Sequence, residues 1–131
     1  MIHSNAFSYI NVLDRAADAS WIRESAIANN VANVDTPGYK RQDVEFQDIL
    51  ERELKSSKYS SLQNAVNNVS LDNLESRVYT DYESYSYRLD GNNVDIETEN
   101  VELASEQLRY QTLTTAVSRE FERMKTAMQT P

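Results

Sequence analysis

The N-terminal quarter of the chain carries one uninterrupted helical pattern, and its length limits the possible folds. Residues 4–34 contain no glycine or proline, and apolar side chains recur there every three or four residues. The seam consists of Ile10, Leu13, Ala17, Ile27, Val31 and Val34, interrupted in register by Ser20 and Glu24. With Ser4 or Asn5 as the N-cap, this helix is roughly 45 Å long. That is too long for a compact globule of this size, so the pattern favours an extended assembly.

The segment from Asn29 to Lys40 ends this helix and turns the chain. The residue before Pro37 is disfavoured in the α region. Gly38 accepts the positive φ that the third position of a type II turn requires. Asn29 and Asn33 are four residues apart and share a helix face, which indicates amides kept for side-chain hydrogen bonds. The alternative is a helix end that frays into a polar loop.

A second long helix is predicted from about Asp95 to Met128, after a turn at residues 90–93. Acidic residues dominate its start and basic residues its end, an order that complements the helix dipole. Its apolar stripe consists of Leu103, Tyr110, Leu113, Val117, Phe121, Met124 and Met128.

The middle of the chain has weaker patterns. Asp43 to Lys55 predicts a short amphipathic helix with an acidic cap, and residues 56–76 predict a polar loop or short irregular module. Residues 77–89 hold Tyr79, Tyr82, Tyr85 and Tyr87 and predict a strand or extended arm. These tyrosines suit a hairpin packed on the short helix better than stacking on sugar.

Together these patterns predict a mainly α fold. Two long terminal helices pack as a coiled-coil-like pair, and a middle segment adds a small helix and an extended or β-hairpin arm. We expect residues 1–40 and 93–131 to form one assembly unit and residues 41–92 a second. With hydrophobic residues at 40% of the chain, a small core is marginal alone, and neighbouring subunits are expected to complete it.

Composition and motifs argue against catalysis. The 131 residues include no cysteine and one histidine, His3, and the only glycines are Gly38 and Gly91. No phosphate loop, metal-ligand pair or cofactor motif is therefore expected. Glu102 and Glu106 share a helix face, but acids at this spacing are expected on an ordinary surface. We predict no enzyme, no cofactor and no small-molecule substrate.

The net charge of −8 argues against nucleic acid or an anionic membrane as the main partner. The N-terminus has neither a basic region nor a continuous apolar stretch, so no cleaved signal peptide is expected. No apolar run approaches the roughly 20 residues that span a bilayer.

Two motifs resemble those of a known family. The segment Asn29 to Lys40 resembles the N-terminal signature of bacterial flagellar axial proteins, which build the rod and hook. Residues 90–97, followed by Ala104 and by the run Gln107 to Gln111, resemble the C-terminal signature of the proximal rod branch. Glu106 departs from the asparagine usual there, and residues 56–88 match nothing in the family.

The resemblance implies a structural subunit of the flagellar basal-body rod, exported by the type III route without a cleaved signal. Its terminal helices would form an inner tube around the export channel. Such a subunit would join the membrane ring and export gate, through the rod-base adaptor, to more distal rod proteins and copies of itself, and would transmit torque. Assembly would be coupled to folding, so the isolated chain is expected to have labile ends.

The residues expected at assembly interfaces come from both helices and both turns: Ile10, Leu13, Ile27, Asn29, Asn33, Pro37, Gly38, Tyr39, Asp90, Gly91, Asn92, Asn93, Leu108, Tyr110, Gln111, Leu113, Val117 and Phe121. Three alternatives remain: a helical chaperone or adaptor of a secretion apparatus, a carbohydrate- or peptidoglycan-binding module built on the tyrosines, and a neighbouring rod protein.

Overall fold

The computed structural model describes residues 7–56, 61–82 and 91–129 of the chain. In chain order the elements are α1 (Ser8–Ala32), β1 (Gln42–Glu45), α2 (Gln47–Ser56), α3 (Leu62–Asn67), the 3₁₀ turn η2 (Leu71–Asn73), β2 (Arg77–Thr80) and α4 (Ile96–Met128). The described part of the chain contains no helix that is both long and apolar enough to cross a membrane.

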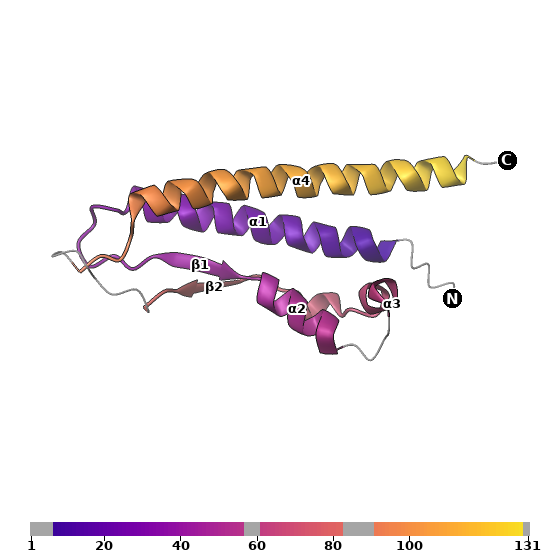
Figure 1. Ribbon diagram of the computed structural model, residues 1–131, viewed down its shortest axis with the longest axis horizontal. Coiled ribbons are helices and arrows are strands. Elements are labelled where there is room, and N and C mark those ends of the chain that lie inside the picture. The colour runs from indigo at the N-terminus through magenta and orange to yellow at the C-terminus, as the bar shows by residue number, and fades with distance from the viewer. Residues whose placement is uncertain (1–6, 57–60, 83–90, 130–131) are drawn as a thin grey trace.

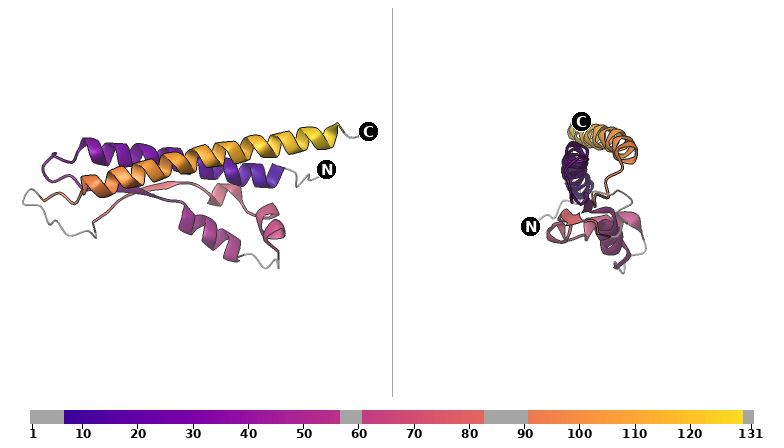
Figure 2. Two further views of the ribbon diagram at one scale, coloured as in Figure 1. Left: turned by 45° about the horizontal axis from the view of Figure 1, so that its top comes forward. Right: turned by 90° about the vertical axis from the view of Figure 1, so that its left-hand side faces the viewer.

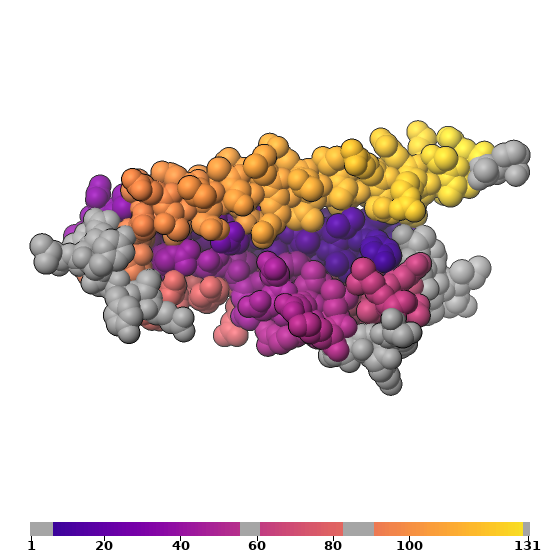
Figure 3. Space-filling view, viewed as in Figure 1, coloured from indigo at the N-terminus to yellow at the C-terminus, as the bar shows by residue number. Residues whose placement is uncertain are grey.

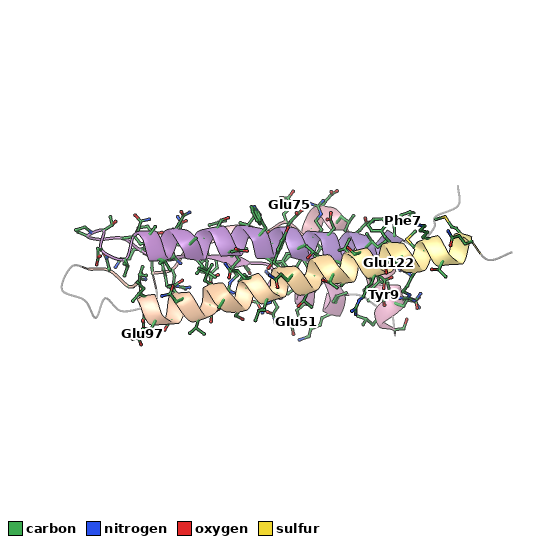
Figure 4. The ribbon with its side chains drawn as sticks, turned by 90° about the horizontal axis from the view of Figure 1, so that it is seen from above. Phe7, Tyr9, Glu51, Glu75, Glu97 and Glu122 are labelled. Atoms are coloured by element: carbon green, nitrogen blue, oxygen red, sulfur yellow. The ribbon has the colours of Figure 1, made fainter. Side chains whose placement is uncertain are left out.

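The two long helices lie side by side and run in opposite directions (Figure 1). Figure 4 labels Glu97 near the start of α4 and Glu122 near its end, beside Phe7 and Tyr9 at the start of α1. The C-terminal end of α4 projects beyond α1 (Figures 1 and 2). This arrangement confirms the predicted fold class of paired terminal helices with a smaller middle segment.

The middle segment forms a second layer against α1, on the side away from α4 (Figures 1 and 2). β1 and β2 pair antiparallel, with Val44 opposite Val78 and Asp43 opposite Tyr79. Helices α2 and α3 and turn η2 connect the strands. The sheet packs chiefly on α1, not on the short helix as the tyrosine pattern suggested.

The hydrophobic core is small and centred on α1. Ile10, Ala17, Ala19, Ala26 and Ile27 are buried on this helix, and the middle segment and the α4 entry contribute Ala65, Val66, Leu74 and Val94. Burying a whole side chain such as Ile27 stabilises the fold by about 1.5–3 kcal/mol. The small number of buried apolar residues agrees with the low hydrophobic content of the sequence.

The boundaries of the long helices were predicted well. Asp95 caps α4, and its side chain accepts from the Glu97 and Thr98 amides at 3.0 and 3.4 Å. Helix α1 begins at Ser8 after Phe7, and the proposed caps Ser4 and Asn5 lie outside the described residues.

The predicted start of the short helix at Asp43 is wrong. Residues 42–45 form strand β1, and α2 begins at Gln47. The local pattern missed the strand because its partner, β2, lies more than thirty residues away along the chain. Residues 56–76, expected to be irregular, contain α3 and η2.

Candidate functional site

The two sequence motifs meet at one end of the helix pair. The Asn92 side chain donates to the Val34 carbonyl at 3.0 Å. Asn93 accepts from the Arg41 amide and donates to the Asp81 carbonyl, both at 2.8 Å. Asn92 and Asn93 are buried, so the turn before α4 holds the end of α1 and both strand ends together.

The Thr36–Tyr39 turn has the geometry that its sequence predicted. The Tyr39 amide donates to the Thr36 carbonyl at 3.2 Å, and Gly38 has a φ of 73°. This is a type II turn with glycine at the third position. Gly91 also has positive φ, at 79°, and a Cβ there would lie 4.0 Å from the Gly38 Cα. The two turns therefore approach each other at their glycines.

Asn30 is the buried amide of this region. Its side chain is fully buried; it accepts from the Gln42 amide and donates to the Gln42 carbonyl, both at 2.8 Å. It also donates to Glu99 at 3.1 Å and accepts from the Tyr39 hydroxyl at 3.2 Å. All donor and acceptor positions of its side-chain amide are therefore hydrogen-bonded. By pairing with both the N–H and the C=O of Gln42, this side chain makes the two hydrogen bonds that a neighbouring strand would make with β1.

Two arginines extend this network along the helices. The Arg23 guanidinium contacts Asp43 at 2.8 Å, Glu102 at 2.8 Å and Glu106 at 2.6 Å. Glu106 is almost fully buried and also accepts from the Ser20 hydroxyl at 2.6 Å. Arg23 on α1 therefore links α4 and β1.

Arg41, just before β1, has a matching role nearer the turns. Its guanidinium contacts buried Glu99 at 2.7 Å, Asp81 at 3.0 Å and Asp43 at 3.3 Å. We call the network formed by Arg23, Asn30, Arg41, Asp43, Glu99 and Glu106 the polar joint. It connects α1, α4 and the sheet at several points through charged and amide groups.

The electrostatics of the polar joint follow from burial and pairing. Burial would raise the pKa of Asp43, but hydrogen bonds from Arg23 and the Val44 amide outweigh it and hold the pKa below its usual value. Burial and the nearby Glu99 carboxylate raise the pKa of Tyr39. At neutral pH the Asp43 carboxylate is therefore ionised between the Arg23 and Arg41 guanidinium groups.

The expectation that Glu106 is an ordinary surface acid is wrong. Glu99 and Glu106 fall in the same three-four register as the stripe residues Leu103, Tyr110 and Leu113. The position of these two acids within the apolar stripe was the feature of the sequence that could have predicted buried ion pairs. Their partners could not be found from sequence, because Arg23 and Arg41 lie tens of residues away along the chain.

A groove of about 1180 Å³ runs beside the polar joint, between the helix pair and the middle segment. Its walls mix apolar side chains, such as Val44, Phe46 and Leu113, with the carboxylates of the joint. Asp43 and Glu106 in these walls contact Arg23. The residues that the structure describes hold no cluster of histidine, cysteine or acidic groups suited to a metal ion.

The predicted interface residues are distributed across the fold. The structure buries Ile10, Ile27, Asn92 and Asn93, half-buries Leu13, Asn33, Tyr39, Gly91, Tyr110, Leu113 and Val117, and exposes Asn29, Pro37, Gly38, Leu108, Gln111 and Phe121. Asp90 lies outside the described residues, as do Tyr85 and Tyr87. The structure thus separates residues that hold the chain together from residues free to meet other chains.

Several large apolar residues of α4 are exposed to solvent. Phe121 is 51% exposed, Leu108 65% and Met128 78%. Figure 3 shows the end of α4, in yellow, standing clear of the rest of the chain. α4 therefore carries large apolar side chains that the single chain leaves exposed.

Comparison with known proteins points to one family. A family model described as "Flagella basal body rod protein" matches residues 10–40. The flagellar basal body rod protein FlgB of Bacillus subtilis strain 168 is 36% identical over 121 residues, which cover 91% of this chain and 92% of the relative. FlgB of Borrelia hermsii is 32% identical, covering 86% and 89% of the two chains. FlgB of Escherichia coli K12 is 29% identical, covering 82% and 83%.

Proposed function

The chain belongs to the FlgB family of flagellar basal body rod proteins, and we propose that it forms the proximal end of that rod. Membership makes it a structural component of the basal body that assembles with other rod proteins, and not an enzyme. The proposal adds its place and task. It joins the membrane ring and export gate, through the rod-base adaptor, to the distal rod, transmits torque and encloses the export channel.

The observation that carries the proposal is the uncovered apolar stripe of α4. Leu113 and Val117 are only half-buried, and Phe121, next to Glu122 at the level of the start of α1, is 51% exposed. A single chain cannot cover this stripe, whereas copies of itself and other rod proteins can. We assign residues 1–40 and 93–131 to the inner tube and residues 41–92 to an outer layer.

The polar joint supports the mechanical part of the proposal. It fixes the sheet to both long helices through short, buried charge-assisted contacts, among them Arg23–Glu106 at 2.6 Å and Arg41–Glu99 at 2.7 Å. A subunit that passes torque between layers needs such a fixed angle between its two units. The joint supplies that rigidity within one chain.

Complementation tests the proposal. The chain is expressed in a Bacillus subtilis strain deleted for its own FlgB, and motility and the number of complete rods in purified basal bodies are measured. We expect the unsubstituted chain to restore both. Failure to restore rods, with the chain present and folded, would contradict the proposed function.

The variant pair Phe121→Glu and Phe121→Leu tests whether other subunits cover the exposed apolar stripe of α4. Because Phe121 is exposed in the single chain, Glu there leaves folding unchanged but places a charge in the assembled interface. We expect Phe121→Glu to abolish rods and Phe121→Leu to retain them, with equal helix content by circular dichroism. Ile27 is unsuitable for this test, since it is fully buried and a charge there unfolds the chain itself.

A further inference from the structure

The groove between the helix pair and the middle segment is not used by the proposed function. Its lining residues fall within 16–23 of α1, 43–50 of β1 and α2, 79–82 at the end of β2, and 102–113 of α4. Its volume of about 1180 Å³ exceeds the roughly 300–1,000 Å³ of a small-molecule pocket. Along α4 the groove is about 16 Å long, which is enough for about three turns of a helix. This size suits a segment of polypeptide.

Helix α2 leaves its apolar side only partly covered along the groove. Phe46 and Leu50 line the groove and are half-buried, as is Ile49 beside them. α2 starts at the end of β1 and slopes away from the two long helices (Figures 1 and 2), and it packs chiefly on α3. A helix of 10 residues is marginal by itself. A partner in the groove would cover the apolar side that the single chain leaves open.

The α1 wall of the groove consists of small side chains. Ala16 and Ala19 of α1 line the groove, and Val44 of β1 continues the apolar surface. The distance at which two helices pack depends on the side chains at their contact. Alanine on this wall therefore leaves room for the larger side chains of an incoming helix between α1 and α2.

The charge of the groove is negative. Its described lining includes six carboxylates and two guanidinium groups. Both guanidinium groups, of Arg23 and Arg109, already face the buried Glu106 carboxylate, at 2.6 and 3.7 Å. Asp48 on α2 is exposed and makes no ion pair within the described part of the chain. Glu102 on α4 is 41% exposed beyond its contact with Arg23. Carboxylates therefore border the groove on both sides.

We propose that the groove binds an amphipathic helix of another protein, with apolar residues on one face and lysine or arginine residues on its flanks. The apolar face packs on Ala16, Phe46 and Leu50, and the basic flanks meet Asp48 and Glu102. Recognition of a helix in a groove uses apolar anchors at three-four spacing, which the partly covered side of α2 accommodates.

Charge selects this partner over the alternatives. The carboxylates repel the phosphates of a nucleic acid. A second copy of this chain brings a net charge of −8 to an acidic surface, which disfavours it as the occupant. A basic helix gains from the same field. The contact belongs to the middle segment and is separate from the packing of the long helices in the rod.

Peptide binding tests the chemistry of the partner. The probe is a synthetic helix of about 14 residues, or about four turns, with leucine on one face and lysine on both flanks. Its matched control carries glutamate in place of lysine. Fluorescence anisotropy measures the binding of each labelled peptide to the purified chain, so the result does not depend on whether the chain builds rods. We expect micromolar binding of the lysine peptide and at least tenfold weaker binding of the glutamate peptide. Equal affinities, or no binding of the lysine peptide, would overturn the proposal.

Two matched variant pairs locate the site. Leu50→Gln and Leu54→Gln each change a half-buried leucine of α2, but only Leu50 lines the groove. Asp48→Asn and Glu75→Gln each neutralise an exposed carboxylate, and Figure 4 labels Glu75 on the side of the helix pair opposite to Glu51 of α2. We expect binding of the lysine peptide to weaken at least fivefold in Leu50→Gln and threefold in Asp48→Asn, and less than twofold in the two controls.

The outcomes decide the proposal. Losses confined to the groove variants, at equal helix content by circular dichroism, support it, whereas equal losses within either pair place binding elsewhere and overturn it. Self-association of the parent chain in sedimentation velocity that Leu50→Gln abolishes would make a second copy the occupant and also overturn it. If Leu50→Gln loses helix content, the Asp48→Asn pair decides, because both of its positions are exposed.

Discussion

Removing the Arg23 guanidinium tests whether the polar joint holds the fold together. The change is Arg23→Met, which keeps much of the side-chain volume and removes the charge. In the folded chain Arg23 is 20% exposed and contacts three carboxylates on two elements. The three carboxylates are buried to different degrees, and the loss of stability expected from each contact depends on that burial.

The loss is concentrated at Glu106. Glu102 is 41% exposed, and an exposed pair of this kind contributes at most about 1 kcal/mol. Asp43 keeps Arg41 at 3.3 Å and the Val44 amide at 2.7 Å. Glu106, 1% exposed, keeps the Ser20 hydroxyl and only a distant Arg109 at 3.7 Å. A buried charge that loses its partner costs about 3–5 kcal/mol, so we expect that decrease in the free energy of unfolding.

The same reasoning gives a pH dependence. In the parent the folded-state pKa of Asp43 is lowered, so its stabilisation is present above pH of about 4 and is lost as the pH falls through the folded pKa. Arg23→Met removes part of this stabilisation, because Arg23 is a main cause of the lowered pKa of Asp43. The difference in stability between parent and variant is therefore largest at neutral pH and smaller below pH of about 4.

Urea unfolding followed by circular dichroism at pH 7 and pH 3.5 measures these differences. The matched control is Arg109→Met, since Arg109 is 52% exposed and faces the same Glu106 carboxylate at 3.7 Å. Its expected loss is below about 1 kcal/mol. The reasoning is refuted if Arg23→Met costs no more than Arg109→Met, or if its deficit grows on acidification.

Three further results are expected. Asn30→Ala leaves the Gln42 backbone and Glu99 without their buried partner and should cost at least about 2 kcal/mol in urea unfolding, whereas Asn29→Ala, at an exposed neighbour, should cost under about 0.5; equal losses would argue against the role of Asn30. Gly38→Ala should cost about 1–2 kcal/mol through its positive φ alone, because no atom lies near the added Cβ, and Gly38→Asn should cost less; the reverse order would exclude a backbone origin. In the isolated chain, amide hydrogen exchange should be fastest in residues 117–128, beyond the polar joint, and uniform slow exchange along α4 would contradict assembly-coupled ordering.

The local patterns of the sequence predicted the long elements and their turns. Three-four spacing after the turn at residues 90–93 was sufficient for α4, because a helix is defined by contacts within one stretch of chain. The Thr36–Tyr39 turn was predicted from proline and glycine for the same reason. Strand β1 was missed, because a strand of four residues exists only through its partner β2.

The sequence did not single out Asn30 as the buried amide of this region. Asn29 and Asn33 share a helix face, and the helical pattern alone gave no reason to prefer Asn30 between them. Only the packing of β1 against α1 shows that Asn30 faces the Gln42 backbone and is fully buried. The roles of Asn29 and Asn33 in assembly stay predictions, since both lie toward the surface of the single chain.

The sequence by itself therefore determined two long helices, the turns that connect them to the middle segment, and a lean core that one chain cannot extend. The tertiary structure decided which polar residues hold these parts at a fixed angle. The physical reason is that the ion pairs of the joint form between residues 58 to 83 positions apart in the sequence: Arg41 with Glu99, and Arg23 with Glu106. Periodicity records which side of a helix is apolar, whereas only folding sets which charge on that side meets another.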